Sequence, residues 1–321
     1  MTERVGWRRI RRGRGFEYRD ENGRRISDDV DLSRLRTLAI PPMWRDVWIS
    51  PDPDADLQAT GVDAAGRTQY RYHESWTQHA AQEKFDRALE LADTLPALRR
   101  SVTRDLRAPG LERTTVLAAA IRMLDTGYLR IGSEAYAREH GSIGLATLRC
   151  RHVQVDQDVV TLAFRGKSGV PWESRIDDPD LAPVLERLLA RGPRARLLAW
   201  RAGRGYRPVR APDINEDLRR RTGGDFTAKD FRTIHGTVIA AAALARIGVP
   251  ADDQARKHAV VEAVRETAAA LGNTPAVARS SYIDPRLLDL FDQGRVVELR
   301  SRSVEAQLPG LLREVEWSET A

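Results

Sequence analysis

The feature that most constrains the fold of this chain is a change of hydrophobic period near residue 75. Before that point, apolar residues alternate in short segments that end at turns or prolines, as in residues 15–18, 38–42 and 47–49. Such alternation is typical of β-strands and buried sheet edges. From about Trp76 onwards the spacing is helical. Because 321 residues with 41% hydrophobic content can bury two cores, we predict an α+β protein with two domains, residues 1–74 and 75–321.

The last predicted strand of the first domain, residues 67–72, has two distinct faces. Alternation sends Arg67 and Gln69 to one side and Tyr70 and Tyr72 to the other. Tyrosines beside cations suit a surface that binds nucleic acid. Taken alone, the pattern fits equally well two tyrosines that pack on a small core with their hydroxyl groups outward.

In the second domain, the helical spacing is interrupted by a β-rich insertion near residues 152–176. Residues 152–164 alternate on both sides of an Asp-Gln-Asp turn, which predicts a hairpin, and residues 170–176 predict a third strand. The remaining segments predict helices over residues 114–123, 181–190, 214–221, 228–247 and 252–271. The last two helices are rich in alanine, which indicates close packing.

The charge of the chain favours a polyanionic partner. Lys and Arg number 52 against 46 Asp and Glu, which gives a net charge of +6. Net charge informs about partners and not about fold, so a nucleic-acid-binding protein and a merely basic enzyme are equally favoured at this point. Four of the cations are lysines, so a lysine that persists among so many arginines is a candidate for a specific role: Lys84, Lys167, Lys229 and Lys257.

Composition argues against several classes of protein and site. No stretch approaches the roughly 18 apolar residues of a membrane-spanning helix. The arginines near the N-terminus precede no apolar core, so we expect no secretory signal and a soluble, cytoplasmic protein. A single cysteine, Cys150, allows no internal disulfide and no cysteine-based zinc site, and the six histidines show no ligand-like pairing. We therefore expect no structural metal.

The segment Gly166-Lys167-Ser168 matches part of a phosphate-binding loop. The full pattern needs a glycine five residues before Gly166, where this chain has Thr161, and it must open a helix, whereas this segment ends a hairpin. Two other glycine pairs, Gly13-x-Gly15 and Gly203-x-Gly205, lack the setting of a dinucleotide fold. We expect no ATP or NAD site.

Arg130 lies between apolar neighbours, directly after a predicted helix end and two residues before Gly132. A glycine there would let a backbone or a phosphate approach closely, so Arg130 is a candidate anion clamp. The competing interpretation is an ordinary ion pair with an acid such as Asp125 or Glu134.

Lys229 and Arg232 lie three residues apart at the start of a predicted helix, so both can face one phosphate near the helix N-terminus. The competing interpretation is a basic face paired with Asp225 or Asp230. Tyr282, just before a helix-starting proline, would by itself be an ordinary core or surface residue.

Taken together, these residues resemble the active site of the small type IB DNA topoisomerases of the bacterial and poxviral kind. The resemblance spans nearly the whole chain in seven motifs that follow the family's order: Gly13-x-Gly15-Phe16-x-Tyr18, Leu38-Ala39-Ile40-Pro41-Pro42-x-Trp44-x-x-Val47-Trp48-Ile49, Gly66-Arg67-x-Gln69-Tyr70-x-Tyr72-His73, Leu129-Arg130-Ile131-Gly132, Phe164-x-Gly166-Lys167, Lys229-Asp230-Phe231-Arg232-Thr233 and Ser281-Tyr282. Seven ordered motifs are far more specific than any one of them, so the competing interpretations lose most of their weight jointly.

The resemblance implies a role for each residue. Tyr282 would attack a DNA phosphodiester and form a 3′-phosphotyrosyl bond, which keeps the bond energy so that resealing needs no ATP. Arg130 and Arg232 would neutralise the nonbridging oxygens. Lys167 would protonate the leaving 5′-oxygen, since lysine releases a proton where arginine practically cannot. Lys229 would act close by as a second cation, and no cofactor or metal is implied.

Asn273 departs from the commonest family pattern, in which a histidine lies nine residues before the tyrosine. Asparagine can donate only a neutral hydrogen bond to a nonbridging oxygen. We therefore expect Asn273 to be a milder transition-state ligand.

The resemblance also implies a C-shaped clamp around double-stranded DNA. The first domain would contact one side of the duplex through Arg67, Gln69, Tyr70 and Tyr72, and the catalytic domain the other. The enzyme would relax supercoils of both signs as a monomer, without nucleotide or membrane, on the nucleoid DNA of the cytoplasm. Two alternatives remain: a DNA-binding module without catalysis, and a tyrosine recombinase, which usually carries His-x-x-Arg where this chain has Lys229-x-x-Arg232.

Overall fold

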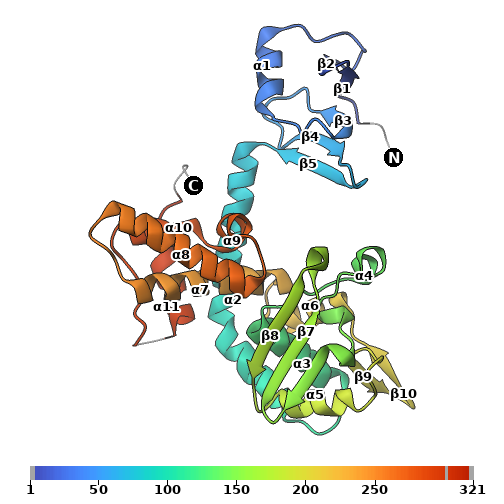
Figure 1. Ribbon diagram of the computed structural model, residues 1–321, viewed down its shortest axis with the longest axis vertical. Helices are drawn as coiled ribbons and strands as arrows, with labels where there is room; N and C mark the ends of the chain where they lie inside the picture. Colours follow the sequence, from blue (N-terminus) through green and yellow to red (C-terminus); the bar gives the residue numbers. More distant parts are fainter. Residues whose placement is uncertain (1–3, 301–302, 318–321) are drawn as a thin grey trace. The chain divides into compact units, whose positions relative to one another are not determined.

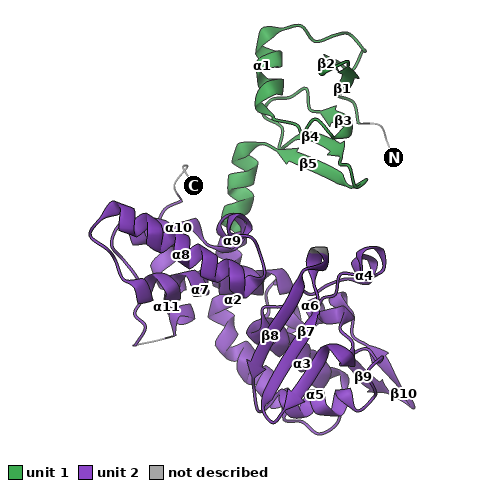
Figure 2. Cartoon of the chain, viewed as in Figure 1, with its two compact units in different colours: residues 1–83 green, residues 84–321 purple. Residues whose placement is uncertain are grey.

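The computed structural model describes residues 4–300 and 303–317, and the chain forms two compact units, residues 1–83 and 84–321 (Figure 1, Figure 2). The first turns of α2 (Glu74–Leu106) group with unit 1 and the rest of this helix with unit 2. Within the described ranges, no helix combines the length and the apolar content that a bilayer crossing requires.

Unit 1 is built on a five-stranded antiparallel sheet with the spatial order β2-β1-β3-β4-β5. Its strands are β1 (Trp7–Arg12), β2 (Gly15–Arg19), β3 (Arg45–Ile49), β4 (Leu57–Val62) and β5 (Thr68–Tyr72). Trp7 and Ile49 of the sheet form the core of this unit together with Leu35 of helix α1 (Asp29–Thr37). The β-rich first part predicted from the alternating pattern is thus an antiparallel sheet with one helix.

Residues 38–42, predicted as a sheet edge, instead follow the last residue of α1, Thr37, with Leu38 as the C-cap of the helix and turns after it. The prediction is wrong because this segment is not extended: Leu38 has helical backbone angles and Ala39 has a φ of +45°. The sequence pattern does not predict α1 itself, since the helix buries a single residue, Leu35, and so leaves no repeating apolar face. The charges of α1 nevertheless suit a helix, since Asp29 and Asp31 lie in its first turn and Arg34 and Arg36 in its last.

Unit 2 is mainly helical and contains a three-stranded antiparallel sheet of order β6-β7-β8. The strands are β6 (Val153–Asp156), β7 (Val159–Arg165) and β8 (Pro171–Asp177), and a separate hairpin consists of β9 (Ala199–Ala202) and β10 (Gly205–Pro208). Besides α2, the helices are α3 (Arg113–Gly127), α4 (Glu134–His140), α5 (Ala182–Leu189), α6 (Ala211–Thr222), α7 (Ala228–Ile247), α8 (Asp253–Leu271), α9 (Pro275–Tyr282), α10 (Pro285–Asp292) and α11 (Val304–Arg313).

Helix α7 is the central element of unit 2. It contacts α3, α6, α8, α9, α10 and α11, and its side chains Phe231 and Ile234 are completely buried. Buried alanines on α7 and α8, such as Ala240 and Ala263, let the two helix axes approach closely. The residues at the start of α7 are therefore held by packing on several sides.

The segment that carries Arg130 is held by backbone contacts. Helix α3 ends at Gly127, and the N–H groups of Leu145 and Ala146 donate hydrogen bonds of 2.9 Å and 2.8 Å to the carbonyls of Arg130 and Ile131. Gly132 has a φ of +71°, and a Cβ atom added there would lie 2.7 Å from the Cα of Gly144. The group that lies close to Gly132 is thus the backbone of Gly144.

Replacing Gly132 should destabilise unit 2 more than an ordinary loop substitution does. In Gly132→Ala, the left-handed backbone costs about 1–2 kcal/mol, and the clash with Gly144 adds to it. Thermal unfolding would measure the effect against Gly223→Ala, a control with a φ of +74° and no atom within 4 Å of the added Cβ. Equal stability of the two variants would contradict the close contact.

Candidate active site

Tyr282 is the last residue of α9 and lies against α7. The hydroxyl of Thr237 on α7 donates a 3.3 Å hydrogen bond to the carbonyl oxygen of Tyr282 and accepts one of 3.1 Å from the N–H of Asp284. Gly236 leaves no room for a side chain, because a Cβ atom there would lie 2.4 Å from the Tyr282 carbonyl oxygen and 2.7 Å from its Cβ. The missing side chain at Gly236 thus determines how closely α9 approaches α7 at the tyrosine.

Arg232, which is 3% exposed, brings a buried positive charge to Tyr282. Its Cζ atom lies 5.0 Å from the centre of the tyrosine ring. Nη1 donates a 2.6 Å hydrogen bond to the carbonyl of Tyr128, and Nη2 a 2.7 Å hydrogen bond to that of Leu271. Burial, and secondly the nearby Arg130, lower the pKa of Arg232 to about 10, so the guanidinium remains charged at neutral pH.

Arg130, which follows α3, also lies near Tyr282 and contacts Asn273. Its Nη2 donates a 2.5 Å hydrogen bond to Asn273 Oδ1 and a 3.2 Å hydrogen bond to the carbonyl of Gly272. Burial lowers the pKa of Arg130, and the nearby Tyr282 acts in the opposite direction. The fold therefore brings Arg130, Arg232, Asn273 and Tyr282 together from four different parts of the chain.

Two buried donors of this cluster lack a hydrogen-bond partner within the described part of the chain, namely Arg232 Nε and Asn273 Nδ2. A buried donor without a partner costs about 1–3 kcal/mol. Such groups are rare in native proteins and call for an explanation, of which a bound or reacting ligand is one. Both donors are the kind that phosphate oxygens accept from.

The competing interpretation of Arg130 and Arg232 as ordinary ion-pair arginines is wrong for the described residues. The acids considered as their partners pair with other arginines: Asp125 with Arg99, Glu134 with Arg196, Asp225 with Arg219, and Asp230 with Arg87. Within residues 4–300 and 303–317, Arg130 and Arg232 thus have no carboxylate partner.

Lys167 lies in the tight turn that joins β7 to β8, and it is exposed. In the described structure its ammonium group makes no hydrogen bond or ion pair. The strand after the turn contacts the loop of Asn273, since a Cβ atom added at Gly272 would lie 2.4 Å from the ring of Trp172. The hairpin that carries Lys167 is thereby connected to the loop of Asn273, which belongs to the cluster around Tyr282.

Lys229 is exposed at the start of α7, one turn before Arg232. A second lysine, Lys84 of α2, lies near it, with its ammonium nitrogen 4.0 Å from the centre of the Phe85 ring. Burial, and secondly the positive charge of Lys229, lower the pKa of Lys84 to about 8, while Asp284 acts in the opposite direction. Motif reasoning misses Lys84, and the scarcity of lysine is the one sequence signal that points to it.

A cluster of charged side chains lies behind the site. The ring of His235 is 5.1 Å from that of Tyr128, whose carbonyl holds Arg232, and His235 Nε2 lies 3.2 Å from Asp125 Oδ1. Asp125, His235 and Glu305 are close enough to ligate a metal ion. The guanidinium of Arg99 already bonds to both carboxylates at 2.6–3.0 Å, so we interpret the cluster as an ion-pair network.

The residues predicted to contact DNA from the first domain lie on β5 and the turn before it. Arg67 and Gln69 both bind the carboxylate of Asp63, at 2.8 Å and 2.9 Å. Tyr70 and Tyr72 are exposed and stacked, with ring centres 6.1 Å apart. Trp76 extends the stack at 4.0 Å from Tyr72. The aromatic surface is therefore longer than the alternation of β5 alone indicates.

Two family models match the chain. Residues 73–289 match "Eukaryotic DNA topoisomerase I, catalytic core", and residues 15–63 match "Bacterial DNA topoisomerase IB, N-terminal domain".

Three viral and fungal proteins show the extent of the similarity. DNA topoisomerase 1B of Acanthamoeba polyphaga mimivirus is 32% identical over 283 residues, which are 86% of this chain and 84% of the viral protein. DNA topoisomerase 1B of vaccinia virus (strain Copenhagen) is 19% identical over 76% of this chain and 75% of its own length. DNA topoisomerase 1 of Mycosarcoma maydis is 30% identical over 31% of this chain and 10% of its own length.

Removing the charge of Lys229 should raise the pKa of Lys84. In Lys229→Gln the repulsion between the two ammonium groups is gone, but burial remains, so the pKa of Lys84 should rise from about 8 and stay below the ordinary 10.5. Titration of lysine ¹³Cε resonances by NMR would measure this in a chain with four lysines. Lys257→Gln, a change on α8, should leave the value unchanged, and an unchanged Lys84 pKa in Lys229→Gln would refute the coupling.

Proposed function

The chain belongs to the type IB DNA topoisomerase family, whose members cut and rejoin DNA strands, and on this premise we propose that it relaxes positive and negative supercoils through a tyrosine–DNA intermediate. The observation that carries the proposal is the convergence of Arg130, Arg232 and Asn273 around Tyr282. Two buried donors of this cluster have no hydrogen-bond partner among the described residues. This arrangement suits an anion next to a nucleophile, which is what cleavage of a phosphodiester requires.

In the proposed reaction, Tyr282 Oη attacks a backbone phosphorus. The new bond joins Oη to phosphorus at the 3′ side, the bond from phosphorus to the 5′-oxygen breaks, and the tyrosine gives up its proton while the 5′-oxygen gains one. The phosphodiester is exchanged and not hydrolysed, so the free 5′-hydroxyl can reverse the step without ATP. Between the two steps the cut strand can rotate about the intact one, driven by torsion stored in the DNA.

Charge stabilisation in this proposal comes from side chains. The attacked phosphate gains negative charge on its nonbridging oxygens, and the planar guanidinium groups of Arg130 and Arg232 each present donors in a geometry that matches two oxygens. Asn273, positioned by its hydrogen bond to Arg130, would offer its free Nδ2 as a neutral donor. The buried charge of Arg232 is costly to the free protein and would be compensated by the incoming phosphate.

We assign proton transfer to the leaving 5′-oxygen to Lys167, with Lys229 as a second cation on the DNA. An arginine holds its proton too tightly for this task, whereas a lysine can release one. The exposed turn between β7 and β8 leaves Lys167 free to meet a bound strand.

The remaining assignments concern DNA binding. Arg67, Gln69, Tyr70 and Tyr72 would contact the duplex from a first domain of residues 1–74, while residues 75–321 hold the opposite side, as a C-shaped clamp that acts as a monomer on cytoplasmic, nucleoid DNA. The exposed, stacked Tyr70 and Tyr72 support such a contact, since aromatic faces and cations suit nucleic acid.

The test is relaxation of positively and negatively supercoiled plasmid in EDTA without ATP. We expect the unmodified protein to relax both and Tyr282→Phe, which keeps the ring but lacks the nucleophilic hydroxyl, to relax neither. Tyr282→Phe should still bind DNA. If neither protein relaxes plasmid although both bind it, the proposal fails, and strand exchange between two duplexes would favour a recombinase instead.

Asn273→Ala should slow cleavage of a short duplex by roughly 10- to 1,000-fold, the range typical of losing one donor to a developing oxyanion. Single-turnover formation of the covalent protein–DNA adduct would measure it. Because Asn273 also accepts from Arg130, Asn273→Asp is a useful companion: it keeps the acceptor but loses the donor and adds a negative charge, so it should be at least as slow. Cleavage by Asn273→Ala at the unmodified rate would remove this residue from the site.

A further inference from the structure

Trp172 lies between the two segments that carry Lys167 and Asn273. It belongs to β8, the strand that follows Lys167, and its side chain is 8% exposed. Its Cβ atom lies 3.9 Å from the position of a Cβ atom added at Gly166, the residue directly before Lys167. Its indole ring lies 2.4 Å from the position of a Cβ atom added at Gly272, the residue directly before Asn273. One buried side chain thus lies beside the immediate neighbours of two proposed active-site residues.

The contact between the indole ring and Gly272 leaves no room for a side chain at the glycine. Gly272 caps α8 with a φ of +56°, a left-handed conformation that favours glycine. The ring atoms Cζ3, Cε3 and Cη2 lie 2.4, 2.8 and 3.7 Å from the position that a Cβ atom would take there. Trp172 therefore packs directly on the backbone that presents Asn273.

The loop of Asn273 is also held by hydrogen bonds that do not involve the indole. The N–H of Asn273 donates a 2.9 Å hydrogen bond to the carbonyl of Ala268. Arg130 donates to Asn273 Oδ1 and to the carbonyl of Gly272. This loop should therefore keep its place when the indole is removed.

The β7–β8 turn has fewer such anchors. In the described structure, β6 pairs with β7 as far as Leu162, so residues 163–173 form a two-stranded end of the sheet (Figure 1). The N–H of Gly166 donates a 2.8 Å hydrogen bond to the carbonyl of Val170, which closes the turn on itself. From another segment, the N–H of Ile143 donates a 3.0 Å hydrogen bond to the carbonyl of Arg165. The orientation of this turn therefore depends on the packing of Trp172 more than the loop of Asn273 does.

The indole Nε1 of Trp172 is buried and donates to no described acceptor. A buried donor without a partner destabilises the folded protein, so packing by itself would favour an apolar ring at this position. The indole is distinguished by its size, since a smaller phenyl ring would not fill the positions of the ring atoms that lie against Gly272. The contact with Gly272 thus gives a reason for a tryptophan despite its unpaired donor.

We propose that Trp172 is a positioning residue for Lys167, because its indole holds the β7–β8 turn against the loop of Asn273. The proton donor and the phosphate-binding loop would then meet the DNA at a fixed separation. The inference rests on the proposed function, in which Lys167 protonates the leaving 5′-oxygen. Trp172 touches neither the DNA nor the reacting atoms. Its loss should therefore weaken proton transfer and spare the contacts to the phosphate.

The test compares two duplexes that differ in the leaving atom, at a cleavage site first mapped with the unmodified protein. With the ordinary 5′-oxygen, the phosphorus–oxygen bond breaks and the oxygen must gain a proton. With sulfur in its place, the bond from Tyr282 Oη to phosphorus forms while the phosphorus–sulfur bond breaks. The sulfur leaves as a thiolate without a proton, since a thiol ionises with a pKa of about 8.5. Sulfur thus removes the need for Lys167 and retains the need for Asn273.

Trp172→Ala should cleave the oxygen duplex about 100-fold more slowly, the loss typical of a reacting group displaced by about 1 Å. It should cleave the sulfur duplex at the unmodified rate. Lys167→Ala should show the same pattern, and the double variant should be no slower than Lys167→Ala, since both changes remove one step. Asn273→Ala should be slow on both duplexes. Single-turnover formation of the covalent adduct measures all of these rates.

Leu162→Ala is the matched control, because it removes a completely buried side chain from the same sheet at a position paired with Ser174. It should lower the unfolding temperature and, below that temperature, cleave both duplexes at the unmodified rate. Trp172→Phe is the companion if Trp172→Ala does not fold. It keeps an aromatic ring, so its defect on the oxygen duplex should be smaller, and sulfur should remove that defect.

Three outcomes overturn the inference and leave the proposed function intact. The first is equal slowing of Trp172→Ala on both duplexes, which would show that the indole supports phosphate binding or the fold. The second is cleavage of the oxygen duplex by Trp172→Ala at the unmodified rate. The third is a double variant slower than Lys167→Ala, which would show that Trp172 acts independently of the lysine.

Failure of the proposed function gives a different pattern. If sulfur does not restore cleavage by Lys167→Ala, the assignment of Lys167 as proton donor is contradicted, and the inference with it. If the unmodified protein cleaves neither duplex, the proposed function itself fails. Rescue of Lys167→Ala by sulfur, without rescue of Trp172→Ala, contradicts the inference alone.

Discussion

The buried guanidinium of Arg232 is the constraint on which the rest of the catalytic unit depends. Its charge is held by the carbonyl of Tyr128, after α3, and by that of Leu271, at the end of α8. Both helices must therefore converge on the start of α7. Carbonyl dipoles compensate a full charge only in part, and burial accordingly lowers the pKa of Arg232. The fold thus retains an unneutralised positive charge beside Tyr282, which favours an anion at that point.

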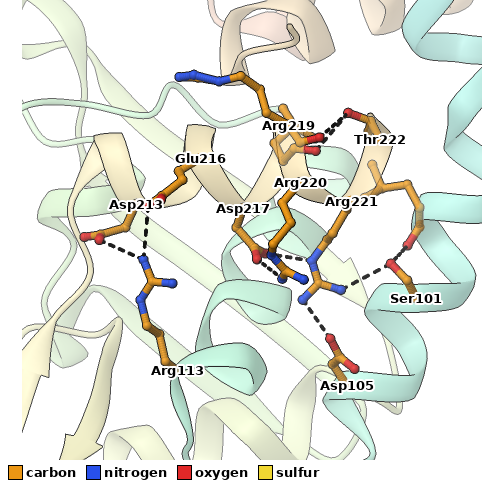
Figure 3. A network of polar contacts seen from close by, with 12 residues as sticks. Ser101, Asp105, Arg113, Asp213, Glu216, Asp217, Arg219, Arg220, Arg221 and Thr222 are labelled. Atoms are coloured by element: carbon orange, nitrogen blue, oxygen red, sulfur yellow. Dashed lines mark hydrogen bonds and ion pairs between the residues drawn. The ribbon is translucent and has the colours of Figure 1, made fainter. Parts of the chain in front are cut away.

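The arginines of this protein differ in their partners. Several inside the framework pair with carboxylates, such as Arg122 with Asp178 and Arg221 with Asp217 and Asp105 (Figure 3), and others, such as Arg191, bind backbone carbonyls. Within the described part of the chain, those of the candidate active site and of the β9–β10 hairpin have no carboxylate partner. Since all these arginines have the same chemistry, composition and net charge cannot separate them. The separation depends on which acidic side chains the fold brings within reach.

The parts of the fold that could be predicted are those with a repeating apolar face. Helix α8 and strands β6 to β8 bury residues at regular spacing, so their positions follow from the hydrophobic period. Helix α7 is buried on nearly all sides in its first half and is recognised by its length and alanine content. Helix α1 buries one residue and α4 none, and β10 is exposed throughout. Elements of this kind cannot be recognised from the hydrophobic pattern, because few or none of their side chains are buried in a core.

The sequence by itself determined which chemical groups are present and in what order. They are Arg130, Lys167, Lys229, Arg232, Asn273 and Tyr282, most of them within motifs that follow the family's order. It also determined where helices and strands with a buried face lie, because burial imposes a period. Only the tertiary structure decided that Asn273 accepts from Arg130, that Gly236 admits Tyr282, and that Lys84 lies near Lys229. These pairs are far apart in the sequence. Their proximity arises from the packing of α2, α7 and α9 and of the segments that follow α3 and α8, which local spacing does not encode.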